Sequence, residues 1–494
     1  MGNWDIAISD KYWHDTYLES TEMITRSGVG VEGAPDDPPR FRGYPGIRLC
    51  PLPQRIPDAI GSLADAFLDR PPRITDPGVI EGHTLGTLLY YGYGLARVDM
   101  GPVSGWPYHR TVPSARCFYP TELYLWLPDG PDFAAGVYHY DQLHHALVPL
   151  RDGDHRELIG DAVDADLAGA SAVLILTSHL WKTAFRYRDY AFRLCTQEAG
   201  MVAGNLLMVA SALGLTGAVH FRFLDEVLDR LVCLTEGEEQ PLAVLPLHAA
   251  KEKAEPASLL AGLAERRARL RTVPADLGLA GATYEMAVNS RIGDLGELQP
   301  IAAAPGPDLA RALRERNSGG TFFKPTNEPV DAEVLHRLAD AMLPYRSDTG
   351  SAPMCRLYVI VQHVTGVEPG VYRLPDMDRV TDLQPDRLGL GLGPPVMDMR
   401  SVNVLCYPVS DRREMTTRFG NRGFGVANAD AGVVTQRLCV LAGAAGLAAR
   451  PVNGYHVPAV QNLLGITDPA LLPMFQVGIG HRNITAQYEM PIIF

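Results

Sequence analysis

The chain has 494 residues, which is more than one ordinary hydrophobic core accommodates, so we expect at least two domains. Its formal net charge of −13 argues against a nucleic-acid partner, because binding to a phosphate backbone requires a basic surface. Seven cysteines without a CxxC pair argue against a zinc site or a disulfide framework. No apolar run is long enough to predict a membrane-spanning helix. We therefore expect a cytoplasmic protein without a metal site or a membrane partner.

The composition changes three times along the chain. Residues 1–80 are rich in Pro, Gly and Asp and predict an irregular N-terminal extension. Residues 81–250 combine strand-like runs with a long apolar helix and form a first unit. Residues 251–305 join a charged amphipathic stretch to an Ala/Gly/Pro-rich stretch and predict a helical or flexible linker. Residues 306–494 form a second unit.

The two units repeat each other. Four landmarks recur in the same order, with offsets of 237, 234, 232 and 232 residues: Ser114-Ala115 as Ser351-Ala352, Gly136-Val137-Tyr138 as Gly370-Val371-Tyr372, Ala199-Gly200 as Ala431-Gly432, and Leu213-Gly214-Leu215 as Ala445-Gly446-Leu447. Any one such string is common in proteins, but four ordered pairs with a nearly constant offset favour a duplication.

Each repeat contains one long helical stretch with small and apolar residues on nearly all sides, at about residues 198–213 and 429–445. A helix that is apolar all round is buried in a core or in an interface. We therefore expect these two helices to pack the units against each other.

Four stretches carry a resemblance to a known family: LLYYGYGLAR (88–97), RTVPSARCFYPTELYLW (110–126), GVYHYDQLHHAL (136–147) and TAFRYRDYAFRLCTQEAG (183–200). They resemble the SagB/McbC-type dehydrogenases of the nitroreductase superfamily, strongly over residues 80–250 and more weakly over 306–494. The resemblance implies an α+β fold with a mainly antiparallel sheet, dimerisation through long central helices and FMN at the interface. With the duplication, it implies two tandem nitroreductase-like units that form an intrachain pseudo-dimer, either monomeric or in a higher homo-oligomer.

The stretch ALRERNSGGTFF (312–323) resembles the family's phosphate-binding signature. The resemblance implies that Arg316 and Ser318 hold the FMN phosphate, with Arg482 as a second cation. Pro113, Ser114 and Ala115 would complete the site from the first unit, and one flavin per chain is expected because the mirror site lacks such a clamp. Arg316 could instead cap a helix or pair on the surface, and Ser114 could be a turn residue.

The family's catalytic Lys-Tyr pair falls on Arg186-Tyr187. Arginine keeps its proton, so we expect Tyr187 to be the proton acceptor, with its pKa lowered by Arg186. Lys182 is an alternative amine, and RYRDY could also be a solvated surface. Glu198 and Asn205, on the central helix, are candidates for the isoalloxazine edge or for ordinary helix N-terminal polarity.

The resemblance implies FMN-dependent oxidation of thiazoline or oxazoline rings to thiazoles or oxazoles in a ribosomally synthesised peptide, such as a thiopeptide, with O2 as electron acceptor. It implies a modified precursor peptide as substrate and a YcaO-type cyclodehydratase complex as partner. Two alternatives are an NAD(P)H-dependent nitro- or quinone reductase and a non-catalytic scaffold.

Overall fold

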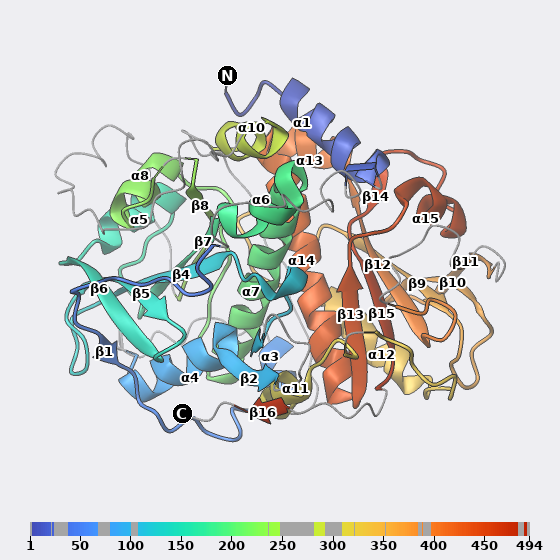
Figure 1. The fold of residues 1–494 in the computed structure, drawn as a ribbon, viewed down its shortest axis with the longest axis horizontal. Coiled ribbons are helices and arrows are strands. Elements are labelled where there is room, and N and C mark those ends of the chain that lie inside the picture. The colour runs from blue at the N-terminus through green and yellow to red at the C-terminus, as the bar shows by residue number, and fades with distance from the viewer. Residues whose placement is uncertain are drawn as a thin grey trace.

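The computed structural model describes residues 2–20, 22–23, 38–67, 80–99, 107–235, 237–247, 281–291, 309–320, 322–350, 352–383, 388, 397–482 and 489–491. Within these residues, two antiparallel sheets lie on either side of a central pair of long helices (Figure 1). None of the described helices is long and apolar enough to cross a membrane.

The two sheets have the same strand order. The first runs β1 (Cys50–Pro51), β6 (Ala146–Asp152), β5 (Gly136–Asp141), β4 (Thr121–Leu127), β7 (Val173–His179) and β8 (Glu239–Pro246). The second runs β11 (Asp378–Asp382), β10 (Gly370–Leu374), β9 (Arg356–Val361), β12 (Val404–Asp411), β15 (Gln476–His481) and β13 (Leu447–Val452), with β14 (Leu471–Pro473) beside β12. The order β6-β5-β4-β7-β8 is thus repeated as β11-β10-β9-β12-β15, and all these neighbours pair antiparallel.

The central strands are buried on both faces because helices cover each side. In β4, Leu123 and Leu125 pack into the large core that includes the central helices. Tyr124 and Trp126, which point to the opposite face, pack into a second core beneath α5 (Arg156–Val163) and α8 (Asp225–Leu231). Two-sided burial explains why the strand is nearly continuously apolar instead of alternating.

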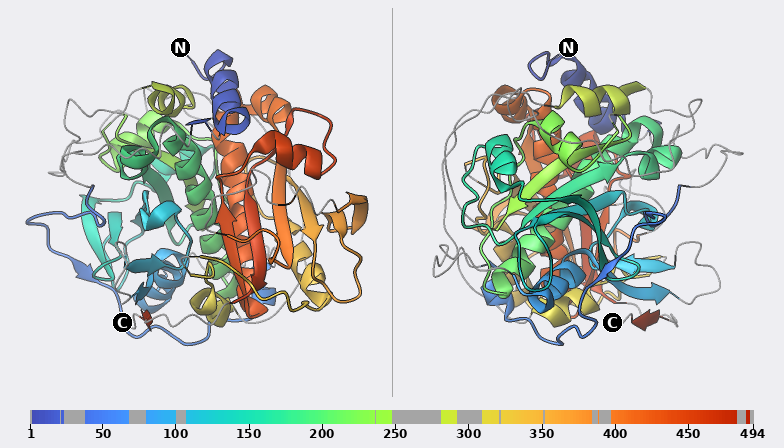
Figure 2. Two further views of the ribbon diagram at one scale, coloured as in Figure 1. Left: turned by 45° about the vertical axis from the view of Figure 1, so that its right-hand side comes forward. Right: turned by 90° about the vertical axis from the view of Figure 1, so that its left-hand side faces the viewer.

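The central pair consists of α7 (Ala191–Ala212) and α14 (Arg422–Ala444), which lie side by side in the views of Figures 1 and 2. Glycines at their crossing allow the backbones to touch. A Cβ atom on Gly200 would lie 2.0 Å from the Ala429 carbonyl oxygen, and one on Gly432 would lie 2.3 Å from that of Gln197. The predicted packing of these helices is therefore confirmed, although both begin about seven residues earlier than the sequence indicated.

The sequence predicted an irregular N-terminal extension, but part of this segment is helical. Residues 7–18 form α1 (Ala7–Trp13) and the π-helical turn η1 (His14–Leu18). Tyr12, Trp13 and Tyr17 are buried, and their ring centres lie 4.8, 4.7 and 6.3 Å from that of Phe424 on α14. Aromatic contacts with a distant helix order this segment, and local sequence composition does not report such contacts.

A third, small sheet joins the C-terminal strand to two strands from the first half of the chain. Its strand order is β16 (Glu489–Pro491), β2 (Leu95–Asp99) and β3 (Tyr108–Arg110). β16 pairs antiparallel with β2, so the C-terminal strand lies against the half of the molecule that contains the first sheet.

The remaining elements cover the sheets and the central pair. They are α3 (Leu63–Phe67), α4 (Gly82–Tyr93), η2 (Ala115–Cys117), α6 (Trp181–Tyr187), η3 (Arg188–Tyr190), α10 (Gly281–Asn289), α11 (Leu309–Glu315), α12 (Glu333–Ala339), η5 (Asp340–Met342), α13 (Arg412–Phe419) and α15 (Val457–Leu463). Of the predicted linker 251–305, only residues 281–291 lie within the described part of the chain, and most of them form α10.

Candidate functional site

Arg316 reaches from the second half of the chain to the first. It follows α11, which lies tightly on α14 because Gly443 has no side chain: a Cβ atom there would be 2.9 Å from the Ala312 carbonyl oxygen. Arg316 is 3% exposed, and its Nε donates a hydrogen bond of 3.0 Å to the carbonyl oxygen of Thr111. Thr111 lies two residues before Pro113, so Arg316 contacts the chain just ahead of the Pro113–Ala115 loop.

Among the residues that the structure describes, no carboxylate pairs with the Arg316 guanidinium. Its Nη1 is buried and has no hydrogen-bond partner among the residues that the structure describes. Arg97 donates a hydrogen bond of 3.2 Å to the Arg316 carbonyl oxygen, and burial together with this neighbouring cation lowers the pKa of Arg316. A buried positive charge with an unsatisfied N–H is costly unless an anion approaches it. Arg316 therefore fits a phosphate, and it neither caps a helix nor pairs on the surface.

A second buried arginine, Arg110, was not singled out from the sequence. It is 1% exposed, and its guanidinium carbon lies 4.4 Å from the ring centre of Tyr93 and 4.8 Å from that of Tyr119. Its Nε and Nη1 find no hydrogen-bond partner within the described ranges. The two aromatic faces hold the cation in place, while its donors stay available for an anion.

The Pro113–Ala115 loop is organised by its serine. Ser114 Oγ accepts a hydrogen bond of 2.9 Å from the backbone N–H of Tyr119, so Ser114 acts at least as a turn residue. This bond places Tyr119 beside Arg110.

Arg110 and Tyr119 line a pocket with Arg40, Phe41, Leu95, Tyr108 and Cys117. The lining contains two arginines and no carboxylate, so it suits an anionic, partly aromatic ligand. Its cavity of about 10 Å³ is far below the roughly 300–1,000 Å³ of most ligand pockets, so the pocket is nearly closed. Arg40 and Phe41 make up part of its wall.

Ser318 has a basic neighbour that differs from the predicted one. Arg450 on β13 donates a hydrogen bond of 2.7 Å from its Nε to the Ser318 carbonyl oxygen, and another to the Gly320 carbonyl oxygen. Arg482 is exposed directly after β15. The sequence missed Arg450 because it lies in the middle of a strand and far from the Arg316 motif along the chain.

Lys182 belongs to a buried network of charges next to the pocket. Its Nζ lies 2.5 Å from a carboxylate oxygen of Glu122, 3.5 Å from the Tyr119 carbonyl oxygen and 3.4 Å from the Arg40 carbonyl oxygen. Burial lowers the pKa of Lys182, and the Glu122 carboxylate opposes this shift. Although burial alone would raise it, Lys182 and His139 hold the pKa of Glu122 well below its usual range.

The predicted pairing of Arg186 with Tyr187 is wrong. The Arg186 guanidinium lies over the Phe185 ring at 5.1 Å, whereas Arg116 lies 5.9 Å from the Tyr187 ring centre. Consecutive residues on a helix point in different directions, so Arg186 does not face Tyr187. Burial raises the pKa of Tyr187, and Arg116 offsets this only in part, so the predicted lowering is also wrong.

Glu198 and Asn205 both lie buried on α7. Tyr93 donates a hydrogen bond of 2.8 Å to Glu198, and burial raises the pKa of Glu198 against the opposing hydrogen bond from Ser114. Asn205 Nδ2 donates to the carbonyl oxygens of Tyr91 and Gly92, and its Oδ1 accepts from Gln436. Asn205 thus ties α4 and α14 to α7, while Glu198 adjoins the Ser114 loop.

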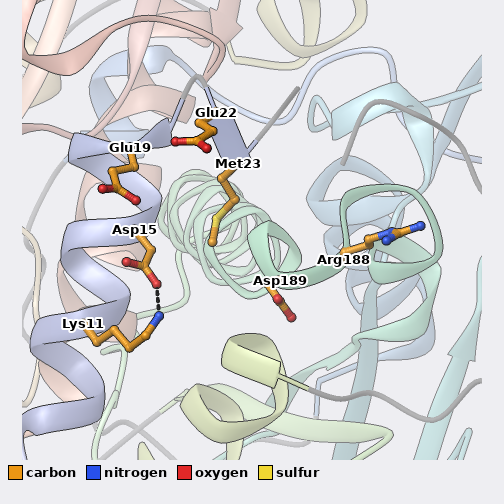
Figure 3. Close-up of a pocket in the computed structure, with 7 residues that line it drawn as sticks. All are labelled: Lys11, Asp15, Glu19, Glu22, Met23, Arg188 and Asp189. Carbon is orange, nitrogen blue, oxygen red and sulfur yellow. Dashed lines mark hydrogen bonds and ion pairs between the residues drawn. The ribbon is translucent and has the colours of Figure 1, made fainter. Parts of the chain in front are cut away.

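A wider pocket lies elsewhere, between the N-terminal helix and η3 (Figure 3). Its lining comprises Lys11, Asp15, Glu19, Glu22, Met23, Arg188 and Asp189, and Lys11 pairs with Asp15. The four carboxylates disfavour a phosphate-bearing ligand. We therefore place the candidate site at Arg316 and Arg110.

Because two buried histidines near the site have lowered pKa values, we expect the protein to lose stability in mild acid. Burial, aided by Arg97, lowers the pKa of His109 to about 4, and burial lowers that of His179 to about 4. An unfolded histidine takes up a proton near pH 6.5. The free energy of unfolding should therefore fall as the pH decreases from about 6.5 to 4, by roughly 1.4 kcal/mol per pH unit for each such group. Urea unfolding at pH 7, 6 and 5 checks this, and His179→Gln should give a shallower slope than the unsubstituted protein. Equal slopes would contradict the assignment.

Three proteins of known sequence are similar to part of this chain. No family model matches the chain. A nitroreductase-type protein of Methanocaldococcus jannaschii is 31% identical over 140 residues, which are 28% of this chain and 69% of that protein. The microcin B17-processing protein McbC of Escherichia coli is 28% identical over 142 residues, which are 27% of this chain and 52% of McbC. The trifolitoxin-processing protein TfxB of Rhizobium leguminosarum is 26% identical over 176 residues, which are 32% of this chain and 45% of TfxB.

The chain thus spans about half the length of the two peptide-processing relatives. A crystal structure of a nitroreductase-type protein from Anabaena variabilis superposes with a TM-score of 0.72. The superposition covers 96% of this chain and 99% of that chain at 19% identity, so the two share their fold.

Proposed function

Because the chain belongs to the nitroreductase superfamily and is of its SagB/McbC type, we propose that it is an FMN-dependent oxidoreductase that oxidises thiazoline or oxazoline rings to thiazoles or oxazoles in a ribosomally synthesised peptide. The proposal includes two tandem units that form an intrachain pseudo-dimer, a modified precursor peptide as substrate and a YcaO-type cyclodehydratase as partner. The peptide-processing names of two relatives support it.

One observation carries the cofactor assignment. Two buried guanidinium groups with unsatisfied N–H donors, Arg316 from the second half and Arg110 from the first, adjoin the same loop. Charge-assisted hydrogen bonds from arginine suit a phosphate or another anionic oxygen. Arg316 would hold the FMN phosphate with Ser318, and Arg450 and Arg482 are the further basic candidates. Since Arg40 and Phe41 narrow the pocket, they would have to shift outward for a tricyclic ring to enter.

The chemistry requires a hydride acceptor and a proton acceptor. When bound, the flavin would supply the hydride acceptor, with O2 as the final acceptor of the two electrons. The α-carbon proton of the azoline must go to a protein base. We assign this role to Lys182 instead of Tyr187, because burial lowers the pKa of Lys182 and raises that of Tyr187. Lys182 also lies beside the pocket-lining residues Tyr119 and Arg40. The Glu122 carboxylate would orient the amine.

This assignment predicts a large loss of activity for one substitution and a small change for another. Lys182→Arg should lower kcat by about 10²-fold or more, because arginine cannot give up its proton and base catalysis contributes about 10²–10⁴-fold. Tyr187→Phe should change kcat by less than about threefold. In the unsubstituted protein, kcat/KM should rise with pH as Lys182 loses its proton, with an apparent pKa below that of an exposed lysine. Loss of activity in Tyr187→Phe alone would restore Tyr187 as the base.

The proposed reaction is tested by anaerobic mixing of the FMN-loaded protein with an azoline-containing peptide. The account predicts bleaching of the flavin absorbance. Mass spectrometry should show that the peptide mass falls by two hydrogen atoms for each oxidised ring. The similarity to a nitroreductase-type protein favours one alternative, an NAD(P)H-dependent nitro- or quinone reductase. Rapid bleaching by NADPH, with no response to the peptide, would establish that alternative instead.

A further inference from the structure

A second pocket lies at the position that the duplication relates to the Arg316 site. Arg316 packs on α14 near Gly443, and the 232-residue offset of the central helices places Ser211 of α7 at the position equivalent to Gly443. The stretch LADAFLDR (63–70) also repeats LARALRER (309–316), which ends in Arg316. Ser211 lines this second pocket together with Ala66, Phe67, Leu207, Leu215, Thr216, Gly217, Pro344, Tyr345, Arg346 and Arg437.

Arg437 gives this pocket a buried positive charge. It is 4% exposed, and its guanidinium carbon lies 5.0 Å from the ring centre of Phe67 and 5.3 Å from that of Tyr345. Its Nη1 donates to the carbonyl oxygens of Ala341 and Leu343. Its Nε is buried and has no hydrogen-bond partner in the part of the chain that the structure covers.

Asp430 is an acidic neighbour of Arg437, but its hydrogen bonds go to other groups. Asp430 accepts hydrogen bonds from the Tyr345 hydroxyl at 2.6 Å and from the backbone N–H groups of Met354 and Cys355 at 3.0 Å each. No ion pair between described residues involves Arg437. A buried guanidinium without a paired carboxylate is stabilised when an anion reaches it.

The rest of the lining indicates what accompanies the anion. Leu207, Leu215, Pro344 and the two aromatic rings provide an apolar wall, and Ser211 and Thr216 add hydroxyl groups. The cavity measures about 40 Å³ and opens to solvent, so only a small ligand suits it. These features fit a compact ligand with one anionic group and an apolar body.

We propose that this pocket binds a small monocarboxylate with an aromatic body, at a site separate from that of the flavin. Arg437 would hold the carboxylate, while Phe67 and Tyr345 contact the ring. This proposal rests on the contacts of Arg437 and is independent of azoline oxidation.

Benzoate is the probe, with benzyl alcohol as its uncharged counterpart, and binding to the flavin-loaded protein is measured by calorimetry. Benzoate should bind saturably, and benzyl alcohol should bind at least about tenfold more weakly, since a hydrogen bond to a charged group contributes about 1.5–3 kcal/mol. Arg437→Met should weaken benzoate binding by about tenfold or more and leave the flavin content unchanged.

If Arg437→Met loses its fold, Leu207→Trp provides a second test, because the indole fills the pocket and leaves the arginine in place. This variant should also abolish benzoate binding. The proposal is overturned if benzoate shows no saturable binding, if it binds the folded variants as well as the unsubstituted protein, or if it displaces FMN.

Discussion

Arg316→Met should weaken FMN binding by about tenfold or more. The substitution keeps a long side chain in the buried position but removes the guanidinium that lies against Thr111. Hydrogen bonds to a charged group contribute about 1.5–3 kcal/mol, which corresponds to a factor of roughly 10 to 150 in affinity. The dissociation constant can be measured by the quenching of FMN fluorescence during titration of the apoprotein.

Arg311 provides the matched control, since it lies on the same helix but is exposed and pairs with Glu315. Arg311→Met should bind FMN as tightly as the unsubstituted protein. Equal affinities for all three proteins would show that Arg316 does not contact the cofactor.

Gly200→Ala should destabilise the fold severely. The added methyl group would lie 2.0 Å from the Ala429 carbonyl oxygen and 2.5 Å from the Ala429 Cα, and neither backbone atom can rotate away. The α7–α14 pair must therefore separate. Forced overpacking typically costs about 1–3 kcal/mol, and contact with backbone should place this variant at or above that range. Thermal and urea unfolding would measure the loss.

Gly425→Ala is the control for this substitution, because it adds the same methyl group to α14, where the nearest atom would be the Thr196 Cγ2 at 3.7 Å. Alanine is favoured over glycine inside a helix by about 0.8–1 kcal/mol, so this variant should be as stable as the unsubstituted protein or more so. Similar stabilities for the two variants would contradict the close crossing of α7 and α14.

Much of the architecture could be predicted because the chain repeats itself. The Gly-Val-Tyr landmarks begin the equivalent strands β5 and β10, and the Ala-Gly landmarks lie on the two central helices. The glycine in each Ala-Gly landmark, Gly200 or Gly432, lies at the helix crossing, where no other side chain fits. Patterns that reflect such local constraints can be read from sequence.

The site could be predicted only where a motif was continuous along the chain. Arg316 was identified and is buried beside the predicted loop. Arg110 and Arg450 were missed because their importance comes from neighbours that are distant in sequence. The charge near Tyr187 was misjudged for the same reason: the sequence offers Arg186, but the fold brings Arg116 instead. Electrostatic surroundings depend on tertiary contacts, which nearest neighbours in sequence do not reveal.

The measurement that tests the shared cofactor site most directly is the FMN content per chain. The purified protein is soaked in excess FMN, freed of unbound cofactor by gel filtration, and assayed for flavin absorbance against protein concentration. The account predicts one FMN per chain, because Arg316 and Arg110 meet at one loop. Two FMN per chain would mean that each half completes its own site, and none would mean that the buried arginines serve another anion.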